Sequence, residues 1–392
     1  MIRLGVVGHG ARISSVIRYV LREVDSSIRV VGIVDPDETN ARARLDECDR
    51  ANVTFYKTLG EMVRKGHLDA LAIGTRCHLH APYAIQAAKY DLPLYLEKPV
   101  AINMGQAIAL EKAFLKSKCQ VVVSFPLRVS PLCELTRKYI AANSIGEPVH
   151  INAFNYVPYG TCYWTEGYRN YKITQGLFLQ KATHDFDYMM FLMNMPITRV
   201  GAMATWQHVF GGNKPAGLRC SSCNETRTCL ESPENSKRNG NSNGADHFCL
   251  YSVDCGSIKA GTNEDCSSAL VEFASGAHGI YTQVFFTRKD AGARGAIISG
   301  YHGTLKFDWY QNELKFTRHH LPFSATEKAT GNASHFGGDI ELAYDFIGLI
   351  KGTIKKSRTP IATGIQSVYA CLAAKESSLT GKFVKVRQTI LE

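Results

Sequence analysis

The sequence predicts an α/β protein of two domains. The first is built on a doubly wound parallel sheet, and the second is an α+β domain with an open, mainly antiparallel sheet. Up to residue 123, short β-branched runs alternate with longer amphipathic stretches, as in repeated βα units. After residue 124, long runs of alternating polar and apolar residues follow one another, which is typical of antiparallel strands. We therefore predict domains at residues 1–123 and 124–392.

The first domain contains six short apolar runs that predict buried strands. Amphipathic stretches such as 83–89 and 108–115 lie between them and have apolar residues three and four positions apart, which predicts helices. Six strands with intervening helices is the count of a Rossmann domain. The predicted strands are residues 2–8, 29–34, 53–56, 70–73, 94–96 and 120–123.

The second domain begins with a helix at residues 130–142, where Ser130 and Pro131 are suited to the cap and first helical position. Further helices are predicted at 183–192, 337–351 and 364–379. The polar segment 232–246 lacks periodicity and predicts a mobile surface loop inside a cysteine-rich insertion at 211–266. The predicted strands are residues 149–157, 198–207, 268–274, 278–287, 295–299 and 304–309.

Composition narrows the classes of protein. The formal net charge of +10 is spread along the chain and lacks a basic stripe interleaved with aromatic residues, which favours anionic small molecules over nucleic acid. The longest apolar runs fall far short of the roughly 20 residues that span a bilayer, so we expect no membrane anchor and no secretory signal. Seven of the twelve cysteines lie singly in core-like segments, which favours free thiols in the cytoplasm.

The first strand leads into Gly8-His9-Gly10-Ala11-Arg12-Ile13, which has two of the three glycines of a G-x-G-x-x-G motif. In this position, between a buried strand and a helix, backbone N–H groups and the helix dipole can hold a pyrophosphate. The third glycine mainly permits close packing of helix and strand, so its replacement by Ile13 affects fit more than phosphate recognition. A plain strand-to-helix turn is the alternative.

Asp35 follows the second strand, where a carboxylate accepts hydrogen bonds from the adenosine ribose and repels a 2′-phosphate. This predicts NAD in preference to NADP. Arg12 and Arg42 are near enough in sequence to favour the 2′-phosphate instead, and a turn aspartate before Pro36 is the structural alternative.

Two motifs at the ends of the fourth and fifth strands carry a family resemblance. Residues 73–82 (IGTRCHLHAP) and 96–99 (LEKP) resemble the glucose–fructose oxidoreductase/inositol dehydrogenase (Gfo/Idh/MocA) family, and 128–131, 183–187 and 337–339 match it in order. The resemblance covers nearly the whole chain except about 211–266. The predicted cofactor-binding residues are Gly8, Gly10, Ala11, Arg12, Asp35, Thr75, Arg76, His78, His80, Glu97, Lys98, Pro99 and Arg128.

Lys98 is the first catalytic candidate, because hydride removal from a carbinol carbon requires a base for the hydroxyl proton. It follows a strand at the carboxyl end, the edge at which doubly wound sheets bind ligands. A neighbouring oxidised nicotinamide would disfavour the ammonium and lower the lysine pKa. Pro99 restricts Lys98 to an extended backbone, and the resemblance implies that the bond between them is cis.

His184 is the second candidate, since the resemblance implies that it lies against the substrate hydroxyl together with the lysine. Asp185 is expected either to orient the imidazole or to cap the helix. Inositol-dehydrogenase-like members carry an aspartate four residues before this histidine, where this chain has Gln180. Since an amide cannot act as a base, Lys181 is the third catalytic candidate, and an ordinary inositol dehydrogenase assignment is in doubt.

Several polar and aromatic residues are suited to stacking on and hydrogen-bonding a sugar, although each is as suited to a sheet face or core. The predicted substrate-binding residues are Lys98, Tyr156, Tyr159, Trp164, Arg169, His184, Tyr281 and Arg288, and His335 is a further candidate. Cys220, Cys223, Cys229 and Cys249 in the insertion have the residue types of a tetrahedral zinc site, but a second closely paired motif is missing. Structural zinc and free or redox-linked thiols remain the alternatives there.

These features predict an NAD-dependent oxidoreductase that transfers a hydride between nicotinamide and a secondary hydroxyl of a sugar, sugar derivative or polyol. One alternative is an NAD-dependent glycoside hydrolase that oxidises its substrate transiently and recycles the cofactor. Another is a nicotinamide-sensing regulator without catalytic activity, which the presence of both Lys98 and His184 disfavours. The resemblance further implies a homo-oligomer, a dimer or a tetramer, formed through the second sheet.

Overall fold

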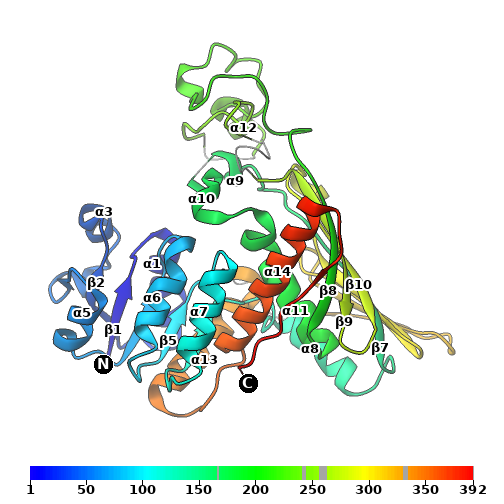
Figure 1. Ribbon diagram of the computed structural model, residues 1–392, viewed down its shortest axis with the longest axis horizontal. Helices are drawn as coiled ribbons and strands as arrows, with labels where there is room; N and C mark the ends of the chain where they lie inside the picture. The colour runs from blue at the N-terminus through cyan, green and yellow to red at the C-terminus, as the bar shows by residue number, and fades with distance from the viewer. Residues whose placement is uncertain (166, 241–243, 256–262, 330–333, 392) are drawn as a thin grey trace.

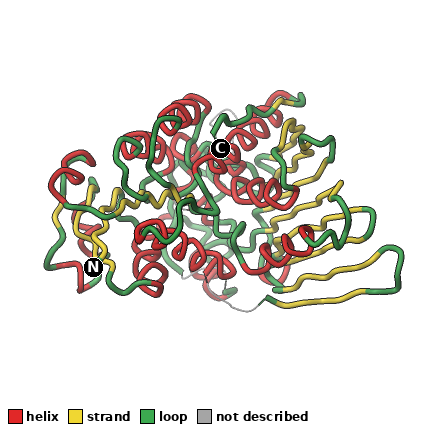
Figure 2. Tube along the Cα trace, turned by 90° about the horizontal axis from the view of Figure 1, so that it is seen from below, coloured by secondary structure: helices red, strands yellow, loops and turns green. Residues whose placement is uncertain are grey.

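The computed structural model describes residues 1–165, 167–240, 244–255, 263–329 and 334–391. Two sheets lie at opposite ends of the molecule, with helices between and around them (Figures 1 and 2). The first sheet has the order β3-β2-β1-β4-β5-β6, and every neighbouring pair is parallel. This is the doubly wound order of a Rossmann domain. Its strands are β1 (Ile2–Val7), β2 (Ile28–Val34), β3 (Thr54–Phe55), β4 (Ala70–Ile73), β5 (Leu94–Leu96) and β6 (Val121–Val123).

Helices flank this sheet and begin where local signals permit. The side chain of Asn103 caps α7 by accepting a hydrogen bond from the Gln106 N–H at 2.9 Å, so α7 starts earlier than the apolar periodicity predicts. The helices are α1 (Ala11–Val16), η1 (Ile17–Leu21), α2 (Arg22–Val24), α3 (Glu38–Ala43), α4 (Glu47–Arg50), α5 (Leu59–Gly66), η2 (Cys77–Leu79), α6 (His80–Ala87) and α7 (Met104–Phe114).

The second sheet has nine strands in the order β14-β13-β12-β11-β7-β10-β9-β8-β15, and only β7 and β10 pair in parallel. The predicted mainly antiparallel sheet is therefore confirmed. Its strands are β7 (Pro148–Tyr156), β8 (Ile197–Thr205), β9 (Cys266–Phe273), β10 (His278–Val284), β11 (Ala293–Gly300), β12 (Gly303–Asp308), β13 (Glu313–Arg318), β14 (Ser324–Lys328) and β15 (Val384–Lys385).

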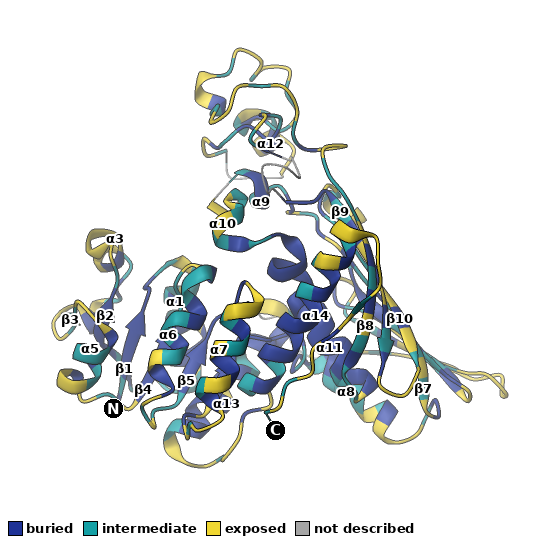
Figure 3. Cartoon of the chain, viewed as in Figure 1, coloured by how far each residue is buried: buried dark blue, intermediate teal, exposed yellow. Residues whose placement is uncertain are grey.

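Helices of the second domain join the two sheets. The long helix α14 (Ile361–Thr380) contacts β8, α7 and β6, and most of its length is buried (Figure 3). Helix α13 (Gly338–Lys351) packs on the Rossmann sheet, where the Phe346 and Tyr95 rings meet edge to face at 5.6 Å. A Cβ on Gly338 would lie 1.8 Å from the Pro126 carbonyl oxygen, so the close approach of α13 to the chain after β6 requires glycine. Helices α8 (Pro131–Ala141) and α11 (Thr183–Met193) complete this layer.

The described residues of the insertion, 211–240 and 244–255, project beyond one end of the second sheet (Figure 1). The prediction of a loop throughout 232–246 is wrong in its first half, because α12 (Pro233–Arg238) forms there. Ser232 caps this helix by accepting from the Asn235 N–H, and Pro233 takes a first-turn position. Residues 241–243 lie outside the described part of the chain. No helix in the described ranges is both long and apolar enough to cross a membrane.

Candidate active site

The turn after β1 has the features of a pyrophosphate site. Gly8 has a φ of +77°, and a Cβ there would lie 2.7 Å from Thr75. Gly10 is the N-cap of a helix that continues through α1, η1 and α2, and no side chain caps it. The first turn, which begins at Ala11, also has no acidic residue, so its backbone N–H groups are available to an anion. This turn therefore fits a dinucleotide.

Asp35 closes the same turn from β2. Its carboxylate oxygens accept hydrogen bonds from the backbone N–H groups of His9, at 2.7 Å, and Asp37, at 2.8 Å. The two arginines that could favour a 2′-phosphate are engaged elsewhere: Arg42 pairs with Glu38 on α3, and Arg12 points toward the other side of the turn. The geometry favours recognition of an unmodified ribose.

Arg12 joins the two domains rather than standing free for a ligand. Its Nε pairs with Glu97 at 3.2 Å and its Nη2 pairs with Asp339, at the start of α13, at 2.7 Å. His335 Nδ1 also lies 2.8 Å from Asp339. Burial alone would raise the pKa of Asp339, but the hydrogen bonds from His335 and Arg12 hold it well below its usual range. Glu97 and Asp339 are therefore anions already paired within the protein.

The predicted motif loops after β4 and β5 are held together by one buried histidine. His80 contacts the Pro99 carbonyl oxygen through Nδ1 at 2.8 Å and the Thr75 carbonyl oxygen through Nε2 at 2.9 Å. The Lys98–Pro99 peptide bond is cis, as the resemblance implies. On the same loop, Arg76 donates to the Gly167 carbonyl oxygen, and His78 Nδ1 is buried without a partner among the described residues. His80 thus has a structural role next to the site.

Lys98 reaches from this loop to the second domain. Its Nζ donates to the Gln180 backbone carbonyl oxygen at 2.9 Å. Burial, and then the charge of Lys181, lowers the pKa of Lys98 to about 8. The lysine lies at the carboxyl end of β5, close to the charges of Lys181 and Glu97, at the position that the sequence predicts for a base.

Gln180 lies in a π-helical turn, η4 (Phe178–Ala182), directly before α11. Its side-chain amide turns away from Lys98 and contacts the Cys77 Sγ at 3.1 Å. Such π-turns occur frequently at functional sites, and this one leaves a backbone carbonyl oxygen for the Lys98 ammonium. The residue that replaces the family's aspartate therefore interacts with Lys98 through its backbone.

Lys181 is buried beside it and directs its ammonium toward Tyr159. Lys181 Nζ donates to the Tyr159 hydroxyl at 2.6 Å and lies 4.8 Å from the centre of that ring. Burial, and then the charge of Arg294, lowers the pKa of Lys181 to about 7. Tyr159 is half exposed, so the pair lies where a ligand can reach it.

His184 follows one residue after the start of α11 and is buried against both domains. Its ring packs edge to face on Phe125, with centroids 5.8 Å apart, and lies 6.4 Å from the ring of His335. Its Nδ1 has no hydrogen-bond partner among the described residues. Burial, and then the charge of Lys98, lowers the pKa of His184 well below its usual value. The neutral imidazole therefore presents an unsatisfied nitrogen beside Lys98.

The sequence predicts that Asp185 orients the His184 imidazole or caps α11, and the described residues show neither role. Its carboxylate forms a bidentate pair with Arg294, Nε–Oδ1 2.9 Å and Nη2–Oδ2 2.7 Å, and both side chains are buried. The Tyr281 hydroxyl donates to the same carboxylate at 2.9 Å, and the Asn155 amide donates at 3.3 Å. The sequence analysis missed Arg294. One sequence signal could have found it: Arg294 is a charged residue immediately before the apolar run 295–299. In the structure β11 directs the Arg294 side chain inward.

Four predicted substrate residues are not at this site. Tyr156 is on the outer face of β7, since Ile151, Ala153 and Asn155 alternate with it on the inner face. Trp164 is fully buried in a separate core, 4.3 Å from the Phe210 ring. The other two hold the insertion: Arg169 pairs with Asp254 and Arg288 pairs with Glu231.

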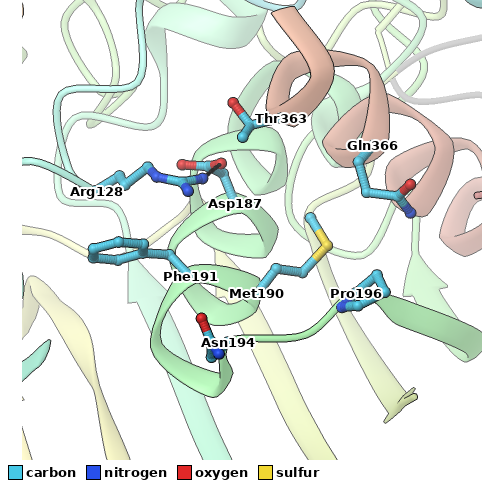
Figure 4. A pocket seen from close by; sticks show the side chains of 8 residues that line it. All are labelled: Arg128, Asp187, Met190, Phe191, Asn194, Pro196, Thr363 and Gln366. Atoms are coloured by element: carbon cyan, nitrogen blue, oxygen red, sulfur yellow. Dashed lines mark hydrogen bonds and ion pairs between the residues drawn. The ribbon is translucent and has the colours of Figure 1, made fainter. Parts of the chain in front are cut away.

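Arg128 is also outside the cofactor edge. Its Nη1 pairs with Asp187 at 2.7 Å, and its guanidinium stacks on Phe191. Both charged residues line a pocket of about 230 Å³ beside α11 and α14 (Figure 4), which none of the other predicted cofactor residues lines. Burial raises the pKa of Asp187 to about 6 in spite of the Arg128 charge.

The cysteines of the insertion do not support the zinc alternative. Cys220 and Cys249 are buried and Cys223 and Cys229 are partly exposed, and all are free thiols. Burial, and then the neighbouring Cys249, raises the pKa of Cys220 to about 12. Across the described ranges, no group of three or more histidine, cysteine or acidic side chains has the arrangement needed to hold a metal ion.

A doubly wound sheet with a strand-to-helix turn suited to a phosphate, and with Lys98 at its carboxyl edge near His184 of the second domain, is typical of nicotinamide-dependent oxidoreductases. Residues 2–125 match the family described as "oxidoreductase family, NAD-binding Rossmann fold", and residues 134–306 match the GFO/IDH/MocA C-terminal domain. The chain belongs to the Gfo/Idh/MocA oxidoreductase family.

Curated relatives are distant. The chain is 26% identical to the rhizopine catabolism protein MocA of Rhizobium meliloti over 214 residues, which cover 54% of this chain and 62% of that protein. It is 23% identical to the myo-inositol 2-dehydrogenase of Thermotoga maritima over 202 residues, which cover 51% of this chain and 57% of that protein. In both cases the chain spans less than two thirds of the relative's length.

Solved structures share the fold over the full chain. A levoglucosan dehydrogenase in complex with NADH and L-sorbose superposes with a TM-score of 0.75 at 18% identity and covers 100% of both chains. An NAD-binding oxidoreductase from Klebsiella pneumoniae gives a TM-score of 0.72 at 19% identity, with 99% of both chains covered. At these identities the similarity concerns the fold alone.

Proposed function

We propose that this protein oxidises a secondary hydroxyl of a sugar, sugar derivative or polyol, and reduces the corresponding ketone, with NAD as cofactor. The observation that carries the proposal is the convergence of Lys98, Lys181 and His184 at the carboxyl edge of the Rossmann sheet. The dehydrogenase names of the curated relatives and of the levoglucosan dehydrogenase support a carbohydrate substrate.

Different groups of the chain would bind the cofactor, remove the proton and position the substrate. Backbone N–H groups after Gly10 would hold the pyrophosphate, and Asp35 would hold the ribose. The bound nicotinamide supplies the hydride acceptor or donor. Lys98, with its lowered pKa, is the base that removes the hydroxyl proton, because a neutral amine is accessible near neutral pH. The unsatisfied Nδ1 of His184 positions the same hydroxyl.

An assay of NADH formation tests this function. Purified protein, NAD and a panel of monosaccharides, sugar acids, amino sugars and inositols should give NADH in molar proportion to the ketone formed with at least one member. A glycoside hydrolase that recycles its cofactor would release sugar from glycosides without accumulating NADH. If NADH binds but no member of the panel is turned over in either way, the regulator alternative gains and the oxidoreductase proposal fails.

Cofactor choice gives a separate prediction. We expect NADH to bind more tightly than NADPH, because a 2′-phosphate would approach the Asp35 carboxylate while Arg12 and Arg42 are held in ion pairs. Titration with each reduced cofactor, followed by nicotinamide fluorescence, measures the two dissociation constants. Equal or tighter binding of NADPH would refute the role of Asp35.

We further propose that the protein forms a dimer or tetramer through the outer face of the second sheet. Three apolar side chains are exposed there on neighbouring strands: Met203 (81%), Leu270 (42%) and Ile280 (39%). Leu270 and Ile280 are directly opposite each other, so they form a continuous apolar row that a second copy would cover. Sedimentation equilibrium of the wild type and of Ile280→Lys tests this. A monomeric wild type would contradict the proposal.

We also propose that the protein is located in the cytoplasm. None of its twelve cysteines forms a disulfide, which suits a reducing compartment.

A further inference from the structure

The two lysines of the site have no anionic partner in the protein. Lys98 donates to a backbone carbonyl oxygen and Lys181 donates to a tyrosine hydroxyl, and neither forms an ion pair with any described residue. An ammonium group has three N–H donors, so each lysine keeps two donors that no described residue accepts. A ligand with several acceptor atoms would satisfy them.

The carboxylates near the site are already paired with arginines. Asp185 is held by Arg294 in a buried bidentate pair, and Glu97 and Asp339 are both held by Arg12. Asp185 balances the charge of Arg294, and Arg12 balances one of its two carboxylates, so the charges of Lys98 and Lys181 leave the site with a net positive charge. Buried or partly buried cations without a counter-ion are costly, and a bound anion removes this cost. Burial, and then a neighbouring positive charge, lowers the pKa of both lysines, which is the cost of holding these ammonium groups in the protein.

Lys98 and Lys181 occupy different positions in the site, which suits them to different roles. Lys98 lies on the loop after β5, next to the cofactor turn, whereas Lys181 lies in η4 of the second domain and contacts Tyr159. Lys181 itself is buried, and its ammonium is bonded to the hydroxyl of the half-exposed Tyr159, so a substrate would approach the pair from the Tyr159 side. An acidic group placed at Lys181 would leave Lys98 and His184 free to act on a hydroxyl of the same molecule.

We propose that the substrate is an acidic sugar, whose carboxylate or phosphate group is bound by Lys181 and Tyr159 while its reacting hydroxyl meets Lys98 and His184. This inference rests on the proposed function and narrows it to a substrate class. Neutral polyols such as inositols would lack the group that Lys181 binds. A lysine ammonium suits either anion as a point charge, so carboxylate and phosphate are compared directly in the test.

The test uses matched substrates that differ in charge. D-glucuronate, D-glucuronamide, D-glucose and D-glucose 6-phosphate are compared with NAD, and the galactose series is compared in the same way. We expect kcat/KM to be about 10- to 100-fold higher for the acid or the phosphate than for the amide and the neutral sugar of the same configuration, the range of a charge-assisted hydrogen bond. The preference between glucuronate and glucose 6-phosphate shows whether the substrate carries a carboxylate or a phosphate. Thermal shifts of the NADH-loaded protein with the same four compounds provide a readout that does not depend on turnover.

Two variants assign the preference to a side chain. Lys181→Met should bring acid and amide to within about threefold of each other, mainly through a higher KM for the acid. Lys172→Met removes an exposed lysine of the nearby helix α10 (Tyr171–Thr174) and should retain the full preference. If neutral sugars are oxidised as efficiently as acidic ones, or if Lys181→Met lowers both equally, the inference is overturned while the proposed function survives. If no compound yields NADH but the acidic sugars still raise the melting temperature more than the amide, the proposed function fails and Lys181 remains an anion site.

Discussion

Lys98→Met is expected to lower kcat/KM by about 10²- to 10⁴-fold, the usual effect of removing a general base, and at the same time to stabilise the protein at pH 7. The second effect follows from the lowered pKa. The unfolded chain keeps the Lys98 proton up to about pH 10.5, and the folded protein keeps it only up to about pH 8. Between these values the unfolded state binds more protons, so stability rises with pH, and below about pH 8 the full cost of holding the ammonium is present.

Methionine removes this cost and keeps the length of the side chain. We expect the free energy of unfolding to rise by roughly 1–3 kcal/mol at pH 7, a figure reduced from the full shift because Lys98 is only partly buried and loses its bond to Gln180. Denaturant unfolding at pH 7 and pH 10 measures it, and the gain should shrink at the higher pH. For the wild type, kcat/KM of oxidation should fall about tenfold per pH unit below about pH 8, because the protonated amine cannot accept a proton.

Lys89→Met is the matched control, since Lys89 is an exposed lysine of the same domain. It should leave kcat/KM, its pH dependence and the unfolding free energy unchanged. A Lys98→Met enzyme with wild-type turnover and intact NADH binding would exclude Lys98 as the base. A variant less stable than the wild type at pH 7 would show that the lysine contributes more by its contacts than it costs by its charge.

Asp185→Asn is expected to have the largest effect on stability. It leaves the buried Arg294 guanidinium without a carboxylate, and breaking a buried ion pair from one side costs about 3–5 kcal/mol. The amide also cannot accept hydrogen bonds with both of its polar atoms, so the donors from Tyr281 and Asn155 lose an acceptor. Urea unfolding followed by circular dichroism measures the loss as a lower midpoint for the second domain.

Asp187→Asn provides the comparison on the same helix, two residues away. Asp187 is equally buried, but only one of its oxygens is bonded to a described residue, and burial raises its pKa to about 6, so holding its charge costs stability at neutral pH. We expect a loss of about 1–2 kcal/mol, in the range of a single hydrogen bond to a charged group. The double variant Asp185→Leu/Arg294→Met should recover part of the stability lost in Asp185→Asn, because it removes both charges. Equal losses for Asp185→Asn and Asp187→Asn would contradict the account of the Arg294 pair.

Much of the fold was predictable because it is recorded locally. Five of the six strands of the Rossmann sheet are short apolar runs buried on both faces, the edge strand β3 being the exception, and the limits of all six agree with the prediction to within one or two residues. The edge strand β14 and its neighbour β13 were missed, since strands near a sheet edge with a solvated face carry many polar residues and little apolar signal. Helix α12 was missed because a short polar helix has no periodicity, although Ser232 and Pro233 marked its start.

The sequence by itself determined the class of fold, and it pointed to the candidate phosphate turn at Gly8 and Gly10 and to the three candidate groups Lys98, Lys181 and His184. All of these are properties of residues that are adjacent in the chain or carried by motifs. Only the tertiary structure decided which charges remain free. Asp185 meets Arg294 across 109 positions of sequence, and Arg12 meets Asp339 across 327, so no local pattern specifies these pairs. The packing of helices against the sheet decides whether a charged side chain meets a partner of opposite charge or stays available to a ligand. For that reason three of the predicted site arginines form structural ion pairs in this fold: Arg128, Arg169 and Arg288. Lys98 and Lys181 form none with a described residue and are left for a ligand.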